Sequence, residues 1–235
     1  MHVYDGQIAR HYAAYRPPLH KLILDEALKA RTFGIGLDVG CGTGYSAVAL
    51  AERCEHVVAV DPSQAMLDEA TRHPGITYLP GSGDDLPVDD ASVDLATFAG
   101  VLPYVNAADA ASELHRVCRN DALVLAYDFD VILDRLLESF SLEIVPANDP
   151  YDHAANLSGQ QRVVTQASTS RLVDIRVTAQ QAAHVLLSDK GRYDPLAKRF
   201  GAGDLFETVV DALERQPWSG KLDARIYYTL HRFEG

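Results

Sequence analysis

The chain has 235 residues, of which 47% are hydrophobic, so it suits one soluble domain with a sizeable core. Its 33 acidic and 21 basic residues give a formal net charge of −12. Such a surface repels phosphate backbones, and we therefore expect no nucleic-acid partner.

Cys41, Cys54 and Cys118 have spacings typical of neither a zinc site nor a disulfide framework. No cluster of His, Asp or Glu has metal-ligand spacing, so we expect no metal. The sequence has no signal-peptide pattern and no apolar run near the roughly 20 residues of a membrane helix. These features predict a cytoplasmic protein without a membrane partner.

The first elements in the chain are predicted to be helices. Residues 5–16 have a helical pattern that Pro17 and Pro18 end. Within it, Tyr12 and Arg16 lie four positions apart and hence on one face. Leu19–Ala30 carries apolar residues at helical spacing and is predicted to flank the first strand.

A strand, a glycine-rich turn and a helix follow. Ile35–Val39 reads as a buried strand and Tyr45–Ala51 as the start of a helix, with Gly40, Gly42 and Gly44 between them. Dinucleotide sites instead have the spacing G-x-G-x-x-G and present a helix N-terminus to phosphate. Asp38, expected at the rim of the crevice, suits an ammonium group and would repel a pyrophosphate. S-adenosylmethionine has an α-amino group, a sulfonium and no phosphate, so it fits this pattern.

The next strands end in polar residues at the same edge of a parallel sheet. Val57–Asp61 is a β-branched run that places the Asp61 carboxylate where acids bind ribose hydroxyls in nucleotide-binding folds. Pro62 and Ser63 open the following helix, in which Met66 would face adenine. Further predicted elements are strands at 76–79, 93–98 and 123–127 and a helix at 107–118.

Several of these segments resemble the class I S-adenosylmethionine-dependent methyltransferases. Asp-Val-Gly-Cys-Gly-Thr-Gly at 38–44 looks like the first motif of that family, residues 80–87 resemble its adenine loop, and 89–98 resemble its acidic turn and fourth strand. Residues 4–17 resemble an N-terminal helix that closes over the cofactor in many members. The resemblance covers roughly residues 4–128. The cofactor-binding residues that it implies, together with the spacing arguments above, are Tyr12, Arg16, Asp38, Gly40, Gly42, Gly44, Asp61, Pro62, Met66, Ser82, Gly83, Asp84, Phe98 and Ala99.

The resemblance implies an α/β, Rossmann-like, doubly wound sheet of seven strands in the order 3-2-1-4-5-7-6, with strand 7 antiparallel. We expect a single domain over 1–235, with N-terminal lid helices in 1–31, a cofactor-binding core in 35–130, and substrate or cap segments in 131–170 and 180–220. Leu172–Thr178 and Ala224–Phe233 are the expected last two strands. Gln180–Leu187 and Asp204–Arg215 are expected helices, as is Val131–Phe140, and 145–160 is expected to be a loop.

The predicted function is in-line methyl transfer from S-adenosylmethionine to a small molecule at O, N or C, with S-adenosylhomocysteine as product. The leaving group departs neutral and needs no acid, and a base matters only for a poor nucleophile. Candidates for that base are His153, His11, His184 and Tyr104, with His153 first because it lies after the fifth strand. The alternatives are a cofactor-binding protein with a non-methylating or regulatory role and, disfavoured by the glycine spacing, a nicotinamide-dependent oxidoreductase. Both a monomer and a homodimer stay open.

Overall fold

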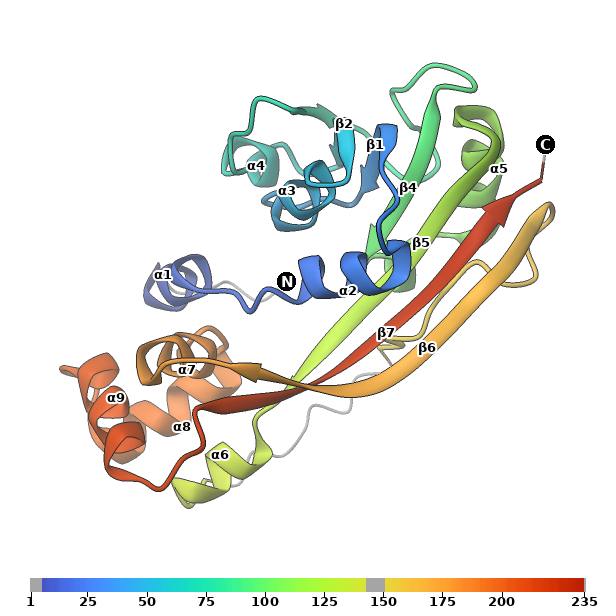
Figure 1. The fold of residues 1–235 in the computed structure, drawn as a ribbon. Coiled ribbons are helices and arrows are strands. Elements are labelled where there is room, and N and C mark those ends of the chain that lie inside the picture. The colour runs from blue at the N-terminus through green and yellow to red at the C-terminus, as the bar shows by residue number, and fades with distance from the viewer. Residues whose placement is uncertain (1–5, 143–150, 235) are drawn as a thin grey trace. The chain divides into compact units, whose positions relative to one another are not determined.

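A computed structural model of the protein describes residues 6–142 and 151–234. Its centre is a seven-stranded sheet in the order β3-β2-β1-β4-β5-β7-β6, as predicted, with strand 7 antiparallel (Figure 1). The strands are β1 (Phe33–Val39), β2 (Cys54–Asp61), β3 (Ile76–Pro80), β4 (Val93–Ala99), β5 (Cys118–Ile132), β6 (Val163–Arg176) and β7 (Lys221–Phe233). The helices are α1 (Gly6–Ala14), α2 (Leu19–Leu28), α3 (Tyr45–Ala51), α4 (Gln64–Asp68), α5 (Ala107–Val117), α6 (Asp134–Ser139), α7 (Ala179–Leu187), α8 (Lys190–Phe200) and α9 (Leu205–Arg215), with a 3₁₀ turn η1 (Leu102–Tyr104).

The chain divides into two compact units. The sheet unit comprises 18–129, 150–171 and 226–235, and the helical unit comprises 1–17, 130–149 and 172–225. Strands β5, β6 and β7 are long enough to contribute residues to both. Residues 151–170, which were predicted to belong to a substrate or cap segment, fall in the sheet unit.

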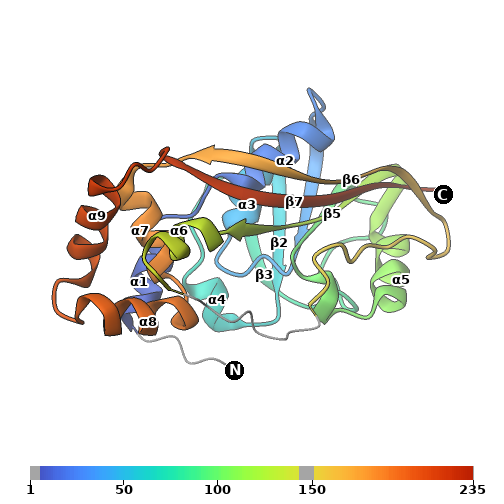
Figure 2. The same cartoon turned by 90° about the horizontal axis from the view of Figure 1, so that it is seen from below.

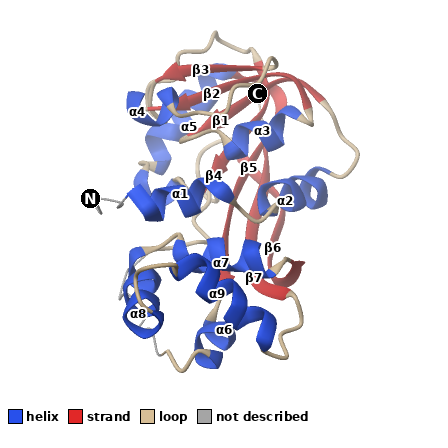
Figure 3. Cartoon of the chain, turned by 90° about the vertical axis from the view of Figure 1, so that its left-hand side faces the viewer, coloured by secondary structure: helices blue, strands red, loops and turns tan. Residues whose placement is uncertain are grey.

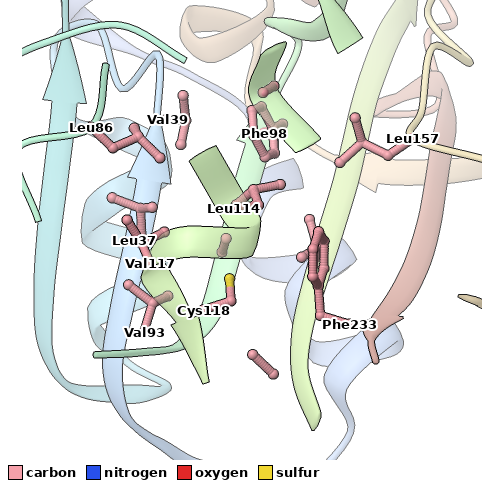
Figure 4. Close-up of a cluster of buried hydrophobic side chains, with 14 of the residues drawn as sticks. Leu37, Val39, Leu86, Val93, Phe98, Leu114, Val117, Cys118, Leu157 and Phe233 are labelled. Carbon is pink, nitrogen blue, oxygen red and sulfur yellow. The ribbon is translucent and has the colours of Figure 1, made fainter. Parts of the chain in front are cut away.

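In the sheet unit, helices cover both faces of the sheet. Helices α2 and α3 lie on one face and α5 on the other (Figure 3). Alternate strand residues point to opposite faces, so β1 sends Leu37 and Val39 toward α5. There they join Phe98, Leu114 and other buried side chains in one apolar cluster (Figure 4). Burial of this cluster fixes which face each strand residue takes.

The parallel register brings the strand ends that matter to one edge. Val39 of β1 pairs with Val60 of β2 and with Phe98 of β4, and Ala99 pairs with Tyr127 of β5. The carboxyl ends of β1, β2 and β4 are therefore neighbours, and they lie beside Tyr127 within β5, which continues to Ile132. Ligands of open α/β sheets bind at this edge.

In the helical unit, α7 packs against α1, α8 and α9 (Figure 2). Thr178 and Gln181 form a capping box at the start of α7, an arrangement that satisfies two backbone donors. Helix α8 was not predicted because Gly191 and Pro195 both disfavour a helix interior. The Asp189 carboxylate, which accepts from the Arg192 amide at 3.2 Å, and the buried Leu196 favour it nonetheless.

Further elements differ from their predicted bounds. Helix α1 ends at Ala14 because Pro17 disfavours the helical conformation of the residue before it. Strands β5, β6 and β7 begin earlier than expected, at Cys118, Val163 and Lys221. Within 6–142 and 151–234, no helix combines the length and apolar character needed to cross a membrane.

Candidate functional site

The turn between β1 and α3 depends on glycine at three positions. Gly40, Gly42 and Gly44 have φ of +71°, +53° and +86°, a region that other residues adopt only with strain. A Cβ at Gly40 would lie 2.4 Å from Val101 Cγ2, and one at Gly44 would lie 2.3 Å from the Tyr78 hydroxyl oxygen. At Gly42 a Cβ would meet nothing within 4 Å. The backbone at Gly42 is thus open to close approach by a ligand.

Asp38 is fully buried behind this turn. Its carboxylate accepts hydrogen bonds from Ser46 Oγ of α3 at 2.5 Å and from Thr97 Oγ1 of β4 at 2.7 Å. Burial raises the pKa of Asp38 to about 6, against the opposing effect of the two hydroxyl bonds. The expected position at the rim is therefore wrong, because these hydroxyls hold the carboxylate inside. Asp38 supports the turn by joining β1, β4 and α3.

Asp61 lies at the carboxyl end of β2, where the sequence placed it. It is 9% exposed, and its two oxygens accept from the backbone amides of Gly42 at 2.8 Å and Ser63 at 2.9 Å. Each carboxylate oxygen can accept a second hydrogen bond. Next to it, Pro62 is exposed and Met66 is 48% exposed on α4. Asp61 thus ties the glycine turn to β2 and retains capacity for a diol.

The expected adenine segment forms a tight turn after β3. The Ser82 amide donates to the Asp85 carbonyl at 3.2 Å, and Ser82 Oγ donates to Asp84 Oδ1 at 2.6 Å. This second bond holds the pKa of Asp84 below its usual value. A Cβ at the buried Gly83 would lie 2.8 Å from Val105 Cγ1. The Ser82 amide is used within the turn and is not available to a purine.

At the end of β4 the chain bends against the glycine turn. Phe98 is 1% exposed and belongs to the apolar cluster, so its ring packs in the core and is not exposed to a ligand. Ala99 is half-buried beside it. Gly100, with φ of +67°, and Val101 follow, and Val101 lies against Gly40. A small cavity of about 10 Å³ lies here, lined by Phe98, residues 100–103, Tyr127, Asp128, Asp152, His153 and Ala155.

His153 lines that cavity and pairs with a carboxylate. Its Nδ1 lies 2.8 Å from Asp128 Oδ2, and since an ionised carboxylate only accepts, Nδ1 is the donor. The Tyr151 hydroxyl lies 2.9 Å from the same oxygen and 2.8 Å from the Gly100 carbonyl oxygen. The His153 ring stacks on Tyr227 at 5.5 Å between centroids. Tyr104, the other candidate at this edge, is 76% exposed, with its ring 5.7 Å from that of Tyr151.

Sequence reasoning found His153 but missed its partners Asp128, Tyr151 and Tyr227. Asp128 directly follows the buried run Leu123–Tyr127, as Asp61 ends its own strand. The rule that located Asp61 would have located Asp128. Nothing in the local sequence relates Tyr151 or Tyr227 to it.

The other predicted site residues lie in the helical unit. The guanidinium of Arg16 lies 3.8 Å from the centre of the Tyr12 ring, so these two side chains form a cation–π pair. His11 Nδ1 and His184 Nδ1 are 3.0 Å apart, and both rings contact Phe206. Burial lowers the pKa of both histidines. The expected contact of Tyr12 and Arg16 with the cofactor stays a prediction.

Among the residues that the structure describes, no group of three or more His, Cys, Asp or Glu could hold a metal ion. The cysteines of the sheet unit are thiols in apolar surroundings. Burial raises the pKa of Cys54 and of Cys118 to about 12 and raises that of Cys41 as well. Such thiols are inert.

The fold and this edge define a class of protein. Residues 37–126 match the family model described as a methyltransferase domain, and they include the glycine turn, Asp61 and strand β4. The strand order is that of the class I S-adenosylmethionine-dependent methyltransferases. The chain therefore has the class I fold, and its residues 37–126 are similar to a methyltransferase domain.

Individual relatives match part of the chain. An uncharacterized methyltransferase of Mycobacterium tuberculosis is 36% identical over 48% of this chain and 47% of its own length. The malonyl-[acyl-carrier protein] O-methyltransferase of Serratia marcescens is 37% identical over 38% of this chain and 36% of its own. The chain thus spans less than half the length of these curated relatives. A solved structure of a candidate type II methyltransferase from Anaeromyxobacter dehalogenans has a TM-score of 0.62 at 24% identity, covering 94% of this chain and 97% of that one.

Proposed function

We propose that the protein binds S-adenosylmethionine at the carboxyl edge of β1, β2 and β4 and transfers its methyl group to a small-molecule acceptor. The observation that carries the proposal is the glycine turn, whose open Gly42 backbone adjoins the Asp61 carboxylate. The match of 37–126 to a methyltransferase domain supports the same reading.

The residues fit the sulfonium donor better than a dinucleotide. Gly40, Gly42 and Gly44 have the spacing G-x-G-x-G, and both Asp38 and Asp61 place acidic groups close to the turn. Negative charge there disfavours a pyrophosphate and favours a cationic nucleoside. Asp61 would hold the ribose diol, the backbone at 82–84 would border adenine, and Ala99 would border the methionine portion. When bound, the donor supplies an electrophilic methyl group whose sulfur leaves as a neutral thioether.

Isothermal titration calorimetry with S-adenosylhomocysteine tests the donor site. We expect Asp61→Ala to weaken binding by tenfold or more, about 1.4 kcal/mol. Asp61→Asn keeps one oxygen acceptor, so its affinity should lie between those of wild type and Asp61→Ala. Asp68→Ala removes the same charge from the exposed end of α4, where the carboxylate bonds only within the helix to Gln64, and serves as the matched control.

Three results would overturn the proposal or its parts. No binding of S-adenosylmethionine or its product to the wild-type chain removes the donor site. Tighter binding of NADH than of S-adenosylhomocysteine favours an oxidoreductase. Equal affinities in the Asp61 and Asp68 variants remove the ribose assignment. Tritium transfer from labelled donor to a metabolite extract separates methyl transfer from a purely regulatory role.

A further inference from the structure

We propose that His153, oriented by Asp128, is the general base of the reaction and that the acceptor is an aromatic hydroxyl compound without a carboxylate or phosphate group. This inference rests on the proposed function. It assigns a proton-accepting residue and a substrate class to the same edge of the sheet.

The pairing of His153 leaves one ring nitrogen for chemistry. Because Nδ1 donates to Asp128 Oδ2 at 2.8 Å, the neutral ring carries its lone pair on Nε2. Asp128 is itself fixed, since Oδ1 accepts from the Phe129 amide at 2.7 Å and Oδ2 is bonded by Tyr151. A carboxylate held this way selects the tautomer and stabilises the imidazolium that forms on proton uptake.

The pair lies beside the expected position of the methyl group. His153, Asp128 and Gly100 line one cavity, and the next residue, Val101, contacts Gly40 of the glycine turn. The side chain of His153 is 34% exposed and that of Asp128 is 16% exposed. The ring is thus accessible to a small molecule while its partner is largely shielded from water.

A base discriminates between acceptor types. A neutral amine attacks without prior deprotonation and a carboxylate is already ionised, whereas a hydroxyl gains from losing its proton in the transition state. Within the described residues, His153 borders two hollows whose linings contain no lysine or arginine. Such linings give a carboxylate or phosphate group on the acceptor no counter-charge. A hydroxyl compound without such a group fits these linings, since any charge it gains is on the oxygen that reacts.

The aromatic side chains around the pair favour a planar acceptor. Tyr104 is exposed and its ring lies 5.7 Å from that of Tyr151, whose ring in turn lies 4.7 Å from that of His153. Offset stacking on such rings holds a flat molecule.

In the reaction the acceptor oxygen forms the new C–O bond as the C–S bond breaks, and the electron pair of the C–S bond stays on sulfur. The hydroxyl proton passes to His153 Nε2.

Catechol and 4-nitrocatechol form a matched pair of probes, because the nitro compound is already ionised at about pH 8 and needs no base. Methyl transfer from S-[methyl-³H]adenosylmethionine is measured for both. His153→Asn keeps an amide donor for Asp128 but removes the ring nitrogen that would accept the proton. We expect it to lower the catechol rate by about 100-fold or more and the 4-nitrocatechol rate by less than about threefold.

Calorimetry gives readouts that do not depend on turnover. S-adenosylhomocysteine should bind His153→Asn as it binds wild type, and Tyr104→Ala should weaken catechol binding to the S-adenosylhomocysteine complex by about fivefold or more. His73→Asn, the same change at an exposed histidine after α4, is the control. If His153→Asn does not fold, Asp128→Asn replaces it, with an expected loss of about tenfold on catechol only.

The outcomes separate cleanly. Equal losses on both probes mean that His153 is structural and overturn its role as base. Binding of S-adenosylhomocysteine with no transfer to either catechol overturns the substrate class and leaves the donor site intact. Failure of the wild-type chain to bind S-adenosylhomocysteine overturns the proposed function itself.

Discussion

Substituting Gly40 by alanine tests how the glycine turn is packed. A Cβ at this position would lie 2.4 Å from Val101 Cγ2 and 2.9 Å from Val101 Cβ, and φ is +71°. The left-handed conformation costs roughly 1–2 kcal/mol for a residue with a Cβ. Overpacking against a β-branched neighbour adds about 1–3 kcal/mol. We therefore expect Gly40→Ala to lose about 2–5 kcal/mol of unfolding free energy.

Gly42→Ala is the matched control for this prediction. Its φ of +53° is equally left-handed, but a Cβ there meets open space. Only the conformational cost of roughly 1–2 kcal/mol applies. Val101→Ala removes the Cγ atoms that cause the closest contact, so the double variant with Gly40→Ala should recover part of the loss. A coupling energy of about 1 kcal/mol or more is expected.

Urea unfolding measures these differences. Far-ultraviolet circular dichroism follows the whole chain, whereas fluorescence of Trp218, the one tryptophan in the sequence, reports on the helical unit. Two probes are needed because two units need not unfold together. Equal stabilities of the Gly40 and Gly42 variants, or no coupling with Val101, would falsify the packing argument.

Three further predictions concern charge. Burial raises the pKa of Asp38 from 3.8 to about 6, so the folded chain binds this proton more tightly, and the stability it contributes is present below about pH 4 and lost as pH rises toward 6. Urea titrations at several pH values should show that the unfolding free energy of wild type falls by on the order of 3 kcal/mol across that window relative to that of Asp38→Asn. A difference between the two proteins that does not change with pH would contradict this. Arg116 donates to Glu113, Leu86 O and Val88 O, so Arg116→Lys should cost about 1–2 kcal/mol; an unchanged urea midpoint would show that the network contributes nothing. Burial lowers the pKa of His184 and of His11, so their contribution is present above about pH 6.5 and lost as pH falls, and His184→Phe should reduce the pH dependence of amide exchange in α7 between about pH 7 and 5.

The strands at the site could be predicted because their signals are local, whereas their order in the sheet came from the family resemblance. The β-branched run ending at Asp61 and the glycine turn each occupy fewer than ten residues, and burial of one strand face follows from alternation. In the structure β1 and β2 end at the predicted residues, Val39 and Asp61, and begin earlier than predicted, at Phe33 and Cys54.

What sequence reasoning missed depends on contacts distant along the chain. Asp128 and His153 are 25 residues apart, and His11 and His184 are 173 apart. The burial of Asp38 depends on Ser46 and Thr97, whose hydroxyls come from two different elements. Local spacing carries no information about such pairings, although Asp128 had the same strand-end signal as Asp61.

The strand order has a consequence for synthesis on the ribosome. β7 is last in sequence but lies between β5 and β6. Until β7 has been synthesised, β6 has no neighbouring strand to pair with. The outer edge of β5, in the part of the sheet formed by β1 to β5, also stays unpaired. Nascent chains stalled before residue 221 should therefore expose an unpaired strand edge that can pair with other chains. Late translation is thus the stage at which we expect this protein to need a chaperone most.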